Sequence, residues 1–179
     1  MGRMMEGLRS SQDSRDAEDT PIFQEVLSHL GPERTVVDIG AGVGRYTIPL
    51  GEIGCHVWAI VPSQPMQAHL LQALAAKRLA VAVHTLPGFW PDVVVPVAEV
   101  ALAAFVIHFS LCPREFVQAM EAAAIERCVV AIHVDPMFSR TNDLMESLSS
   151  GSPHPAAACV QRFVSTACGR RHRRGRTCV

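Results

Sequence analysis

Short apolar runs that are typical of buried strands alternate along this chain with segments of helical periodicity. Most of these runs are apolar throughout, as expected where helices cover both faces of a parallel sheet. The alternation therefore predicts an α/β fold with a mostly parallel sheet and helices on both faces. Strands are predicted near residues 35–39, 56–61, 80–84, 100–107 and 128–134.

The segments between these runs carry helix signals. Thr20 and Pro21 look like an N-cap followed by proline at the first helical position, and Ser63 can cap a later helix. After the fifth strand, one more helix and one more strand can be drawn, at residues 141–148 and 160–166. The other helices are predicted over residues 20–30, 45–53, 63–74 and from 113 to 123.

Length and composition suggest one domain with uneven ends. The chain has 179 residues, of which 49% are hydrophobic, enough for a sizeable core. Residues 1–19 are polar and without periodicity, so we expect a disordered leader before an α/β domain at 20–150. Residues 147–179 carry six arginines and no acidic residue. We therefore expect a basic, poorly ordered tail at 151–179.

Several classes of protein are disfavoured by the same sequence. The longest apolar stretch, residues 93–107, is interrupted by Pro96 and Glu99 and is too short to span a membrane. No apolar core of a signal peptide stands near Met1, so we expect a cytoplasmic protein. The six cysteines form no C-x-x-C pair and no histidines show metal-ligand spacing, so we expect free thiols and no metal site.

A glycine-rich turn follows the first predicted strand. It carries the pattern D-x-G-x-G-x-G, with Asp38 two residues before Gly40 and with Gly42 and Gly44 after it. Glycines at such a turn let a ligand approach the main chain at the carboxyl end of the sheet. A dinucleotide site would need a third glycine where Arg45 stands, so a dinucleotide-binding module is disfavoured.

This turn resembles motif I of the class I S-adenosylmethionine-dependent methyltransferases. Two further phrases, Ala59-Ile60-Val61-Pro62-Ser63 and Pro87-Gly88-Phe89-Trp90-Pro91, resemble those of small bacterial members. The resemblance implies a Rossmann-like methyltransferase fold and S-adenosylmethionine (SAM) as cofactor. It also implies that Asp38 faces the methionine end of SAM through water and that Phe89 and Trp90 lie near the adenine. The main chain beside the cofactor would be lined by Gly40, Ala41, Gly42 and Gly44.

The chain departs from this family in three places. The family carries an acid at the end of the second strand that accepts hydrogen bonds from the ribose, and Val61 stands there. Each unmet ribose hydroxyl would cost about 1–3 kcal/mol. Phe105 stands where relatives often carry a polar residue facing the methyl group. The family's sheet ends with a sixth strand and an antiparallel seventh, and the short C-terminus leaves open whether these terminal strands are missing.

Two functional hypotheses remain after these comparisons of residues. The first is a SAM-dependent methyltransferase whose acceptor is undefined, a small molecule being favoured. The alternative is a methyltransferase-like domain that has lost cofactor binding and is not an enzyme. No catalytic residue is assigned, although His108, Cys112, His133 and Asp135 all follow strands and could contact a substrate. The arginine cluster at 170–176 could bind nucleic acid, but a solvated tail is the favoured interpretation.

Overall fold

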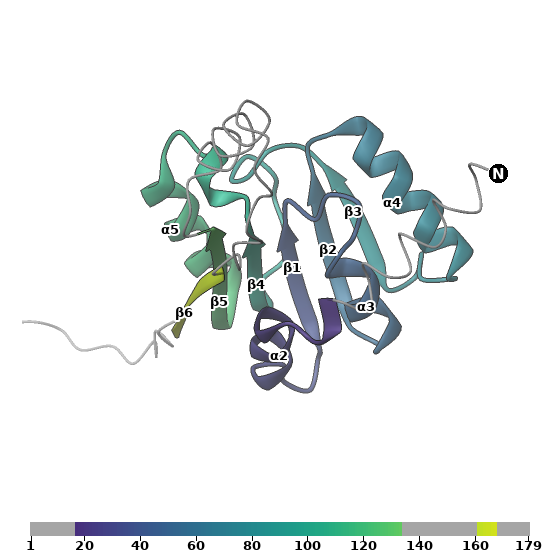
Figure 1. The fold of residues 1–179 in the computed structure, drawn as a ribbon, viewed down its shortest axis with the longest axis horizontal. Helices are drawn as coiled ribbons and strands as arrows, with labels where there is room; N and C mark the ends of the chain where they lie inside the picture. Colours follow the sequence, from purple (N-terminus) through teal and green to yellow (C-terminus); the bar gives the residue numbers. More distant parts are fainter. Residues whose placement is uncertain (1–16, 134–160, 168–179) are drawn as a thin grey trace, which may run out of the picture.

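A six-stranded sheet forms the centre of the computed structural model, which describes residues 17–133 and 161–167 (Figure 1). The strand order is β3-β2-β1-β4-β5-β6, and the first five strands are parallel to one another. Their bounds are β1 Thr35–Ile39, β2 His56–Val61, β3 Val83–Pro87, β4 Ala98–Ala104, β5 Ala124–His133 and β6 Gln161–Ala167. The α/β fold with a mostly parallel sheet is thereby confirmed.

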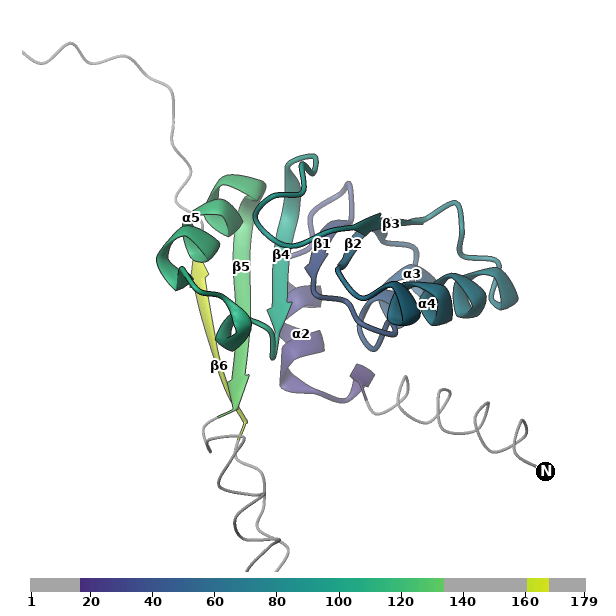
Figure 2. The same cartoon turned by 90° about the horizontal axis from the view of Figure 1, so that it is seen from above.

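Helices cover both faces of this sheet, as Figure 2 shows from above. One face is packed by α2, α3 and α4, and the other by α5 and the connection between β3 and β4. The helices are α2 Pro21–Ser28, α3 Thr47–Glu52, α4 Gln64–Ala76 and α5 Pro113–Ala123, with a short 3-10 helix η1 at Ile107–Phe109. Because strand side chains alternate, Val36 lies in the first core and Val37 in the second.

The predicted strand bounds are confirmed for β1 and β2 and shifted for β3 and β4. β3 begins at Val83 instead of residue 80, because the N–H groups of Ala82 and Val83 donate to the carbonyl of Leu79 in a turn. β4 ends at Ala104 instead of residue 107, because Phe105 has a left-handed φ of 59° that interrupts the extended backbone. β5 begins at Ala124, directly after α5, four residues before the predicted start.

The C-terminal part of the sheet contains one terminal strand. β6 lies at the predicted position and pairs antiparallel with β5, in a register from His133↔Gln161 to Arg127↔Ala167. These residues fall within 151–179, so this part of the predicted tail belongs to the sheet. Ala17, from the predicted leader, is buried in the core. The helix predicted at 141–148 and the arginine cluster at 170–176 lie outside the described residues.

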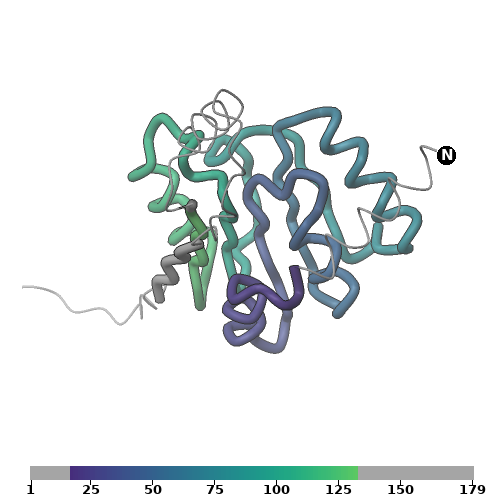
Figure 3. The backbone as a smooth tube through the Cα atoms, in the orientation of Figure 1, coloured from purple at the N-terminus to yellow at the C-terminus, as the bar shows by residue number. Residues whose placement is uncertain are grey.

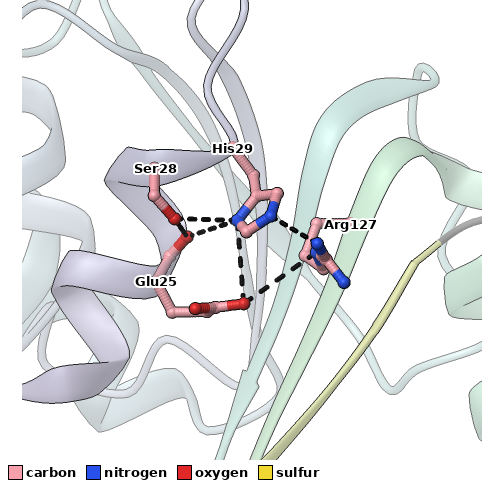
Figure 4. A network of polar contacts seen from close by, with 4 residues as sticks. All are labelled: Glu25, Ser28, His29 and Arg127. Carbon is pink, nitrogen blue, oxygen red and sulfur yellow. Dashed lines mark hydrogen bonds and ion pairs between the residues drawn. The ribbon is translucent and has the colours of Figure 1, made fainter.

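A polar cluster fastens α2 to β5 (Figure 4). Nδ1 of His29 lies 2.9 Å from the carbonyl of Glu25 and 2.9 Å from Oγ of Ser28. Nη2 of Arg127 donates to Nε2 of His29, and Nε of Arg127 lies 3.9 Å from the Glu25 carboxylate. Because arginine can only donate, Nε2 accepts and the proton of this tautomer sits on Nδ1.

A buried carboxylate joins the amino ends of β1 and β4. Glu99 accepts hydrogen bonds from the N–H groups of Glu33 at 3.0 Å and Thr35 at 2.9 Å. Its own N–H donates to Oγ1 of Thr35 at 2.9 Å. A Cβ on Gly31 would lie 2.4 Å from the Glu99 carboxylate, so glycine is required beside it. Each carboxylate oxygen of Glu99 therefore has a backbone donor, as a buried acid needs.

We expect Glu99→Gln to lower the free energy of unfolding by about 2–3 kcal/mol, since one acceptor becomes an NH2 group that faces a backbone donor. Glu52→Gln is the matched control, because Glu52 forms an exposed ion pair with Lys77 worth about 0–1 kcal/mol. Urea denaturation of both variants measures the difference. Equal stability of the two variants would contradict the role given to Glu99.

Candidate functional site

The turn after β1 lies at the point where the order of the sheet reverses. β2 stands on one side of β1 and β4 on the other, and the chain crosses from β1 to β2 before returning to β4. Figure 3 shows this turn at the end of the sheet where β1 and β2 finish. In open α/β sheets this crevice is where ligands bind.

One carbonyl holds the turn in place. The N–H groups of Gly40 and Ala41 both donate to the carbonyl oxygen of Ile60 in β2, at 3.0 and 3.1 Å. The N–H of Gly44 then donates to the carbonyl of Ala41 at 2.9 Å. These bonds shape a turn in which Gly40, Gly42 and Gly44 all have positive φ, at 73°, 59° and 96°.

The three glycines differ in what surrounds them. A Cβ on Gly40 would lie 2.5 Å from Cγ1 of Val106, and one on Gly44 would lie 2.5 Å from Cδ1 of Leu70. A Cβ on Gly42 would meet its nearest atoms at 3.9 and 4.0 Å, an ordinary contact distance. Gly40 and Gly44 are thus required by packing within the chain, whereas Gly42 presents its main chain on the open side of the turn.

Asp38 lies beneath this turn and is 2% exposed. Oγ1 of Thr47, the first residue of α3, donates to Oδ2 of Asp38 at 2.5 Å, and the Thr47 N–H donates to the same carboxylate. Burial raises the pKa of Asp38 from the ordinary 3.8 to about 6, and the hydrogen bonds from Thr47 act in the opposite direction. A buried acid with a perturbed pKa at the reversal point of an α/β sheet is a candidate functional residue.

Val61 occupies the end of β2, where the sequence resemblance places the ribose-binding acid. Its side chain is 1% exposed and belongs to the same core cluster as Ala41 and Leu70. The end of β2 therefore offers methyl groups where a ribose would need hydrogen-bond acceptors.

Phe89 and Trp90, predicted to lie near the adenine, have different surroundings. Nε1 of Trp90 donates to the carbonyl of Phe116 at 3.0 Å, and its ring meets the Phe116 ring edge to face at 6.5 Å. Trp90 therefore anchors the connection between β3 and β4 onto α5. Phe89 is 70% exposed. The proximity of either ring to an adenine stays a prediction.

Phe105 marks the end of β4 with an unusual backbone. Its φ of 59° is costly for a bulky residue, about 1–3 kcal/mol, and its N–H donates to the carbonyl of Ala131 in β5 at 2.8 Å. The next residue, Val106, is the one that fills the space beside Gly40. Sequence reasoning selected Phe105 for its place beside the methyl group, but no sequence signal indicated its strained backbone or the contact of Val106.

Three of the four candidate acid–base residues lie in the described part of the chain, each at or after the carboxyl end of a strand. His108 is exposed, with its ring 4.1 Å from that of Phe109, and Cys112 is exposed at the start of α5. His133 is the last residue of β5, while Asp135 lies outside the described residues. Beside them, Phe109 and Leu111 are 70% and 99% exposed.

Residues 17–133 and 161–167 lack two further kinds of feature. Within these ranges no three or more histidine, cysteine or acidic side chains lie close enough together to bind a metal ion. In the same part of the chain, none of the helices has the length and apolar character needed to cross a membrane.

Comparisons with known proteins identify the fold. No protein-family model matches the chain, and no curated protein is similar to it in sequence. The methyltransferase CcbJ from Streptomyces caelestis superposes with a TM-score of 0.55 and 22% identity, over 65% of this chain and 55% of CcbJ. Magnesium protoporphyrin IX methyltransferase (ChlM) from Synechocystis PCC 6803, solved with bound SAM, gives 0.59 and 17%, over 87% of this chain and 82% of ChlM.

The same fold also occurs in a protein with another activity. The cyclase SpnF superposes with a TM-score of 0.56 and 15% identity, over 61% of this chain and 43% of SpnF. This chain spans little more than half the length of CcbJ and less than half that of SpnF. At these identities the comparisons establish a fold and not an activity. The chain has the Rossmann-like fold of the class I SAM-dependent methyltransferases.

Proposed function

We propose that this protein binds SAM at the turn after β1 and transfers its methyl group to a small-molecule acceptor. The observation that carries the proposal is the buried carboxylate of Asp38 beneath a glycine turn in which Gly42, unlike Gly40 and Gly44, is not closed off by a neighbouring side chain. The fold supports the choice of cofactor, because ChlM shares it and was solved with bound SAM. The acceptor class is supported by the magnesium protoporphyrin IX in the name of ChlM.

The residues at the turn fit one part of SAM better than another. Asp38 would hold the cationic methionine end, and the main chain at Gly42 would allow close approach. Val61 does not fit the ribose, since its side chain is buried and has no atom that accepts a hydrogen bond. SAM supplies an electrophilic methyl group when bound, and the chain's task is to hold it in line with the acceptor.

The buried carboxylate of Asp38 lowers the stability of the folded chain at neutral pH. Its pKa is near 6 in the folded chain and near 3.8 when exposed, so folding favours the protonated form. Well below pH 3.8 both states are protonated and no penalty arises. As the pH rises from about 4 to 6, the unfolded chain releases this proton more readily, so stability falls and the penalty is complete above pH 6. Such stability costs are common at functional sites.

We expect Asp38→Asn to be more stable than wild type at pH 7.5, by at most about 3 kcal/mol for a shift of about two pKa units. The stability difference between the two proteins should grow between pH 4 and 6.5, because the asparagine does not titrate. Urea denaturation across this pH range measures it. A difference that does not change with pH would show that Asp38 does not carry the penalty.

The glycine turn gives the sharpest test of ligand binding, because the chain offers a matched pair of glycines. Gly42 and Gly54 both have positive φ, at 59° and 85°, and a Cβ would clash at neither. Gly54 lies after α3 and away from the turn. Alanine at either position should cost about 1–2 kcal/mol of stability through backbone strain.

We expect Gly42→Ala to weaken SAM binding at least tenfold, since its methyl group would project from the open side of the turn, while Gly54→Ala keeps wild-type affinity. Calorimetric titration with SAM measures both. Equal affinity of the two folded variants would mean that SAM does not use this turn. Absence of SAM binding to wild type at millimolar concentration would favour the alternative, a domain that has lost the cofactor.

The ribose position tests how the site departs from its relatives. If SAM binds here, Val61→Glu should raise the affinity for SAM and for S-adenosylhomocysteine about tenfold, the value of one charge-assisted hydrogen bond. It should leave the affinity for methionine unchanged, because methionine has no ribose. Val61→Met is the apolar control and should gain nothing.

The burial of Val61 decides how this result is interpreted. A glutamate that remained in the core would be an unpaired buried charge and would lower the melting temperature. A destabilised Val61→Glu variant with no gain for either nucleoside ligand would contradict a ribose site at the end of β2. The melting temperatures of both Val61 variants are therefore measured beside the affinities.

A further inference from the structure

Thr47 has no role in the sequence resemblance, yet its side chain is fully buried and bonded to the site. It is 0% exposed and begins α3, nine residues after Asp38. Its hydroxyl donates to Oδ2 of Asp38 at 2.5 Å, and its N–H donates to the same carboxylate. One residue thus supplies two donors to one acid.

The neighbouring strands fix the main chain of Asp38 and supply no polar partner to its side chain in register. In the sheet, Asp38 lies between Ala59 of β2 and Leu102 of β4 in register, and both neighbours are apolar. Within the described residues, the donors recorded for the Asp38 carboxylate both belong to Thr47. A carboxylate has about four lone-pair positions, so two bonds set its plane and leave positions for a ligand.

We propose that Thr47 is a positioning residue, which holds the Asp38 carboxylate ionised and in one orientation so that it can receive the cationic end of a ligand. The proposal rests on the proposed function, because it takes that ligand to be SAM. Without the hydroxyl, burial would act on Asp38 with less opposition and the acid would be protonated at higher pH.

Charged and titratable groups also lie near this turn. Asp38 and Arg45 both act on Tyr46 by charge, and burial raises the pKa of Tyr46 above its ordinary 10. Histidines occur nearby in sequence, His69 on α4 and His108 in η1. The Asp38→Asn variant therefore identifies which part of a change in ligand binding between pH 5 and 8 belongs to Asp38.

The test compares Thr47→Val, which has nearly the same shape but no donor, with Thr47→Ser, which keeps the hydroxyl. SAM affinity is measured by calorimetry from pH 5 to 8. In wild type the affinity should fall as Asp38 becomes protonated near pH 6. In Thr47→Val this fall should begin at higher pH, so that binding at pH 6.5 is about tenfold weaker but nearly unchanged at pH 8. Thr47→Ser should follow wild type.

A second measurement needs no ligand. The carboxyl carbon of Asp38 is titrated by NMR in wild type and both Thr47 variants, and Asp38→Asn identifies its signal. The midpoint should move to higher pH in Thr47→Val and remain in place in Thr47→Ser. A merely structural threonine would change the melting temperature of Thr47→Val without moving either pH midpoint.

The outcomes separate this inference from the proposed function. Coincident midpoints in wild type and Thr47→Val overturn the positioning role, as does a midpoint in Thr47→Ser displaced from that of wild type. The comparison of Thr47→Ser with wild type can be made even where Thr47→Val does not fold. Failure of wild type to bind SAM overturns the methyltransferase proposal, and the carboxyl titration then decides by itself whether Thr47 sets the ionisation of Asp38.

Discussion

The carbonyl oxygen of Ile60 is the anchor on which the candidate site depends. It lies in β2 and accepts hydrogen bonds from the N–H groups of Gly40 and Ala41. These bonds hold the turn after β1 against the neighbouring strand. Val106, after β4, packs against Gly40 from the other side. The turn after β1 is thus held by β2 and by the segment after β4. The position of the main chain at Gly42 follows from these contacts within the chain.

Two buried acids on adjacent strands show how differently this protein uses a carboxylate. Glu99, at the amino end of β4, accepts hydrogen bonds from the N–H groups of Glu33 and Thr35 and so joins β4 to the start of β1. Asp38, at the carboxyl end of β1, receives only donors from Thr47 among the described residues, and its pKa is raised to about 6. The first acid satisfies backbone donors, whereas the second lies beneath the glycine turn at which we propose that a ligand binds.

The end of β2 is where the chain agrees least with the cofactor its fold suggests. Val61 is buried in the same core cluster as Leu70. The glycine turn would therefore suit the methionine end of SAM, whereas the end of β2 has no side-chain acceptor for the ribose. Because the cyclase SpnF has the same fold, the fold by itself does not decide between methyl transfer and other uses of the crevice. The proposed function is therefore tested at Asp38, Gly42 and Val61.

The sequence by itself determined the α/β class, the bounds of β1 and β2, the place of β6 and the glycine turn, because these depend on apolar runs and local glycine chemistry. It did not determine where β3 begins, because a local turn at Leu79 interrupts the apolar run. It did not determine where β4 ends, because the left-handed Phe105 is bonded to Ala131, a partner distant in sequence. The sequence placed Gly40, Gly42 and Gly44 in one class. Only the tertiary structure separated them, because Val106 and Leu70 close on two of the glycines and leave the third open.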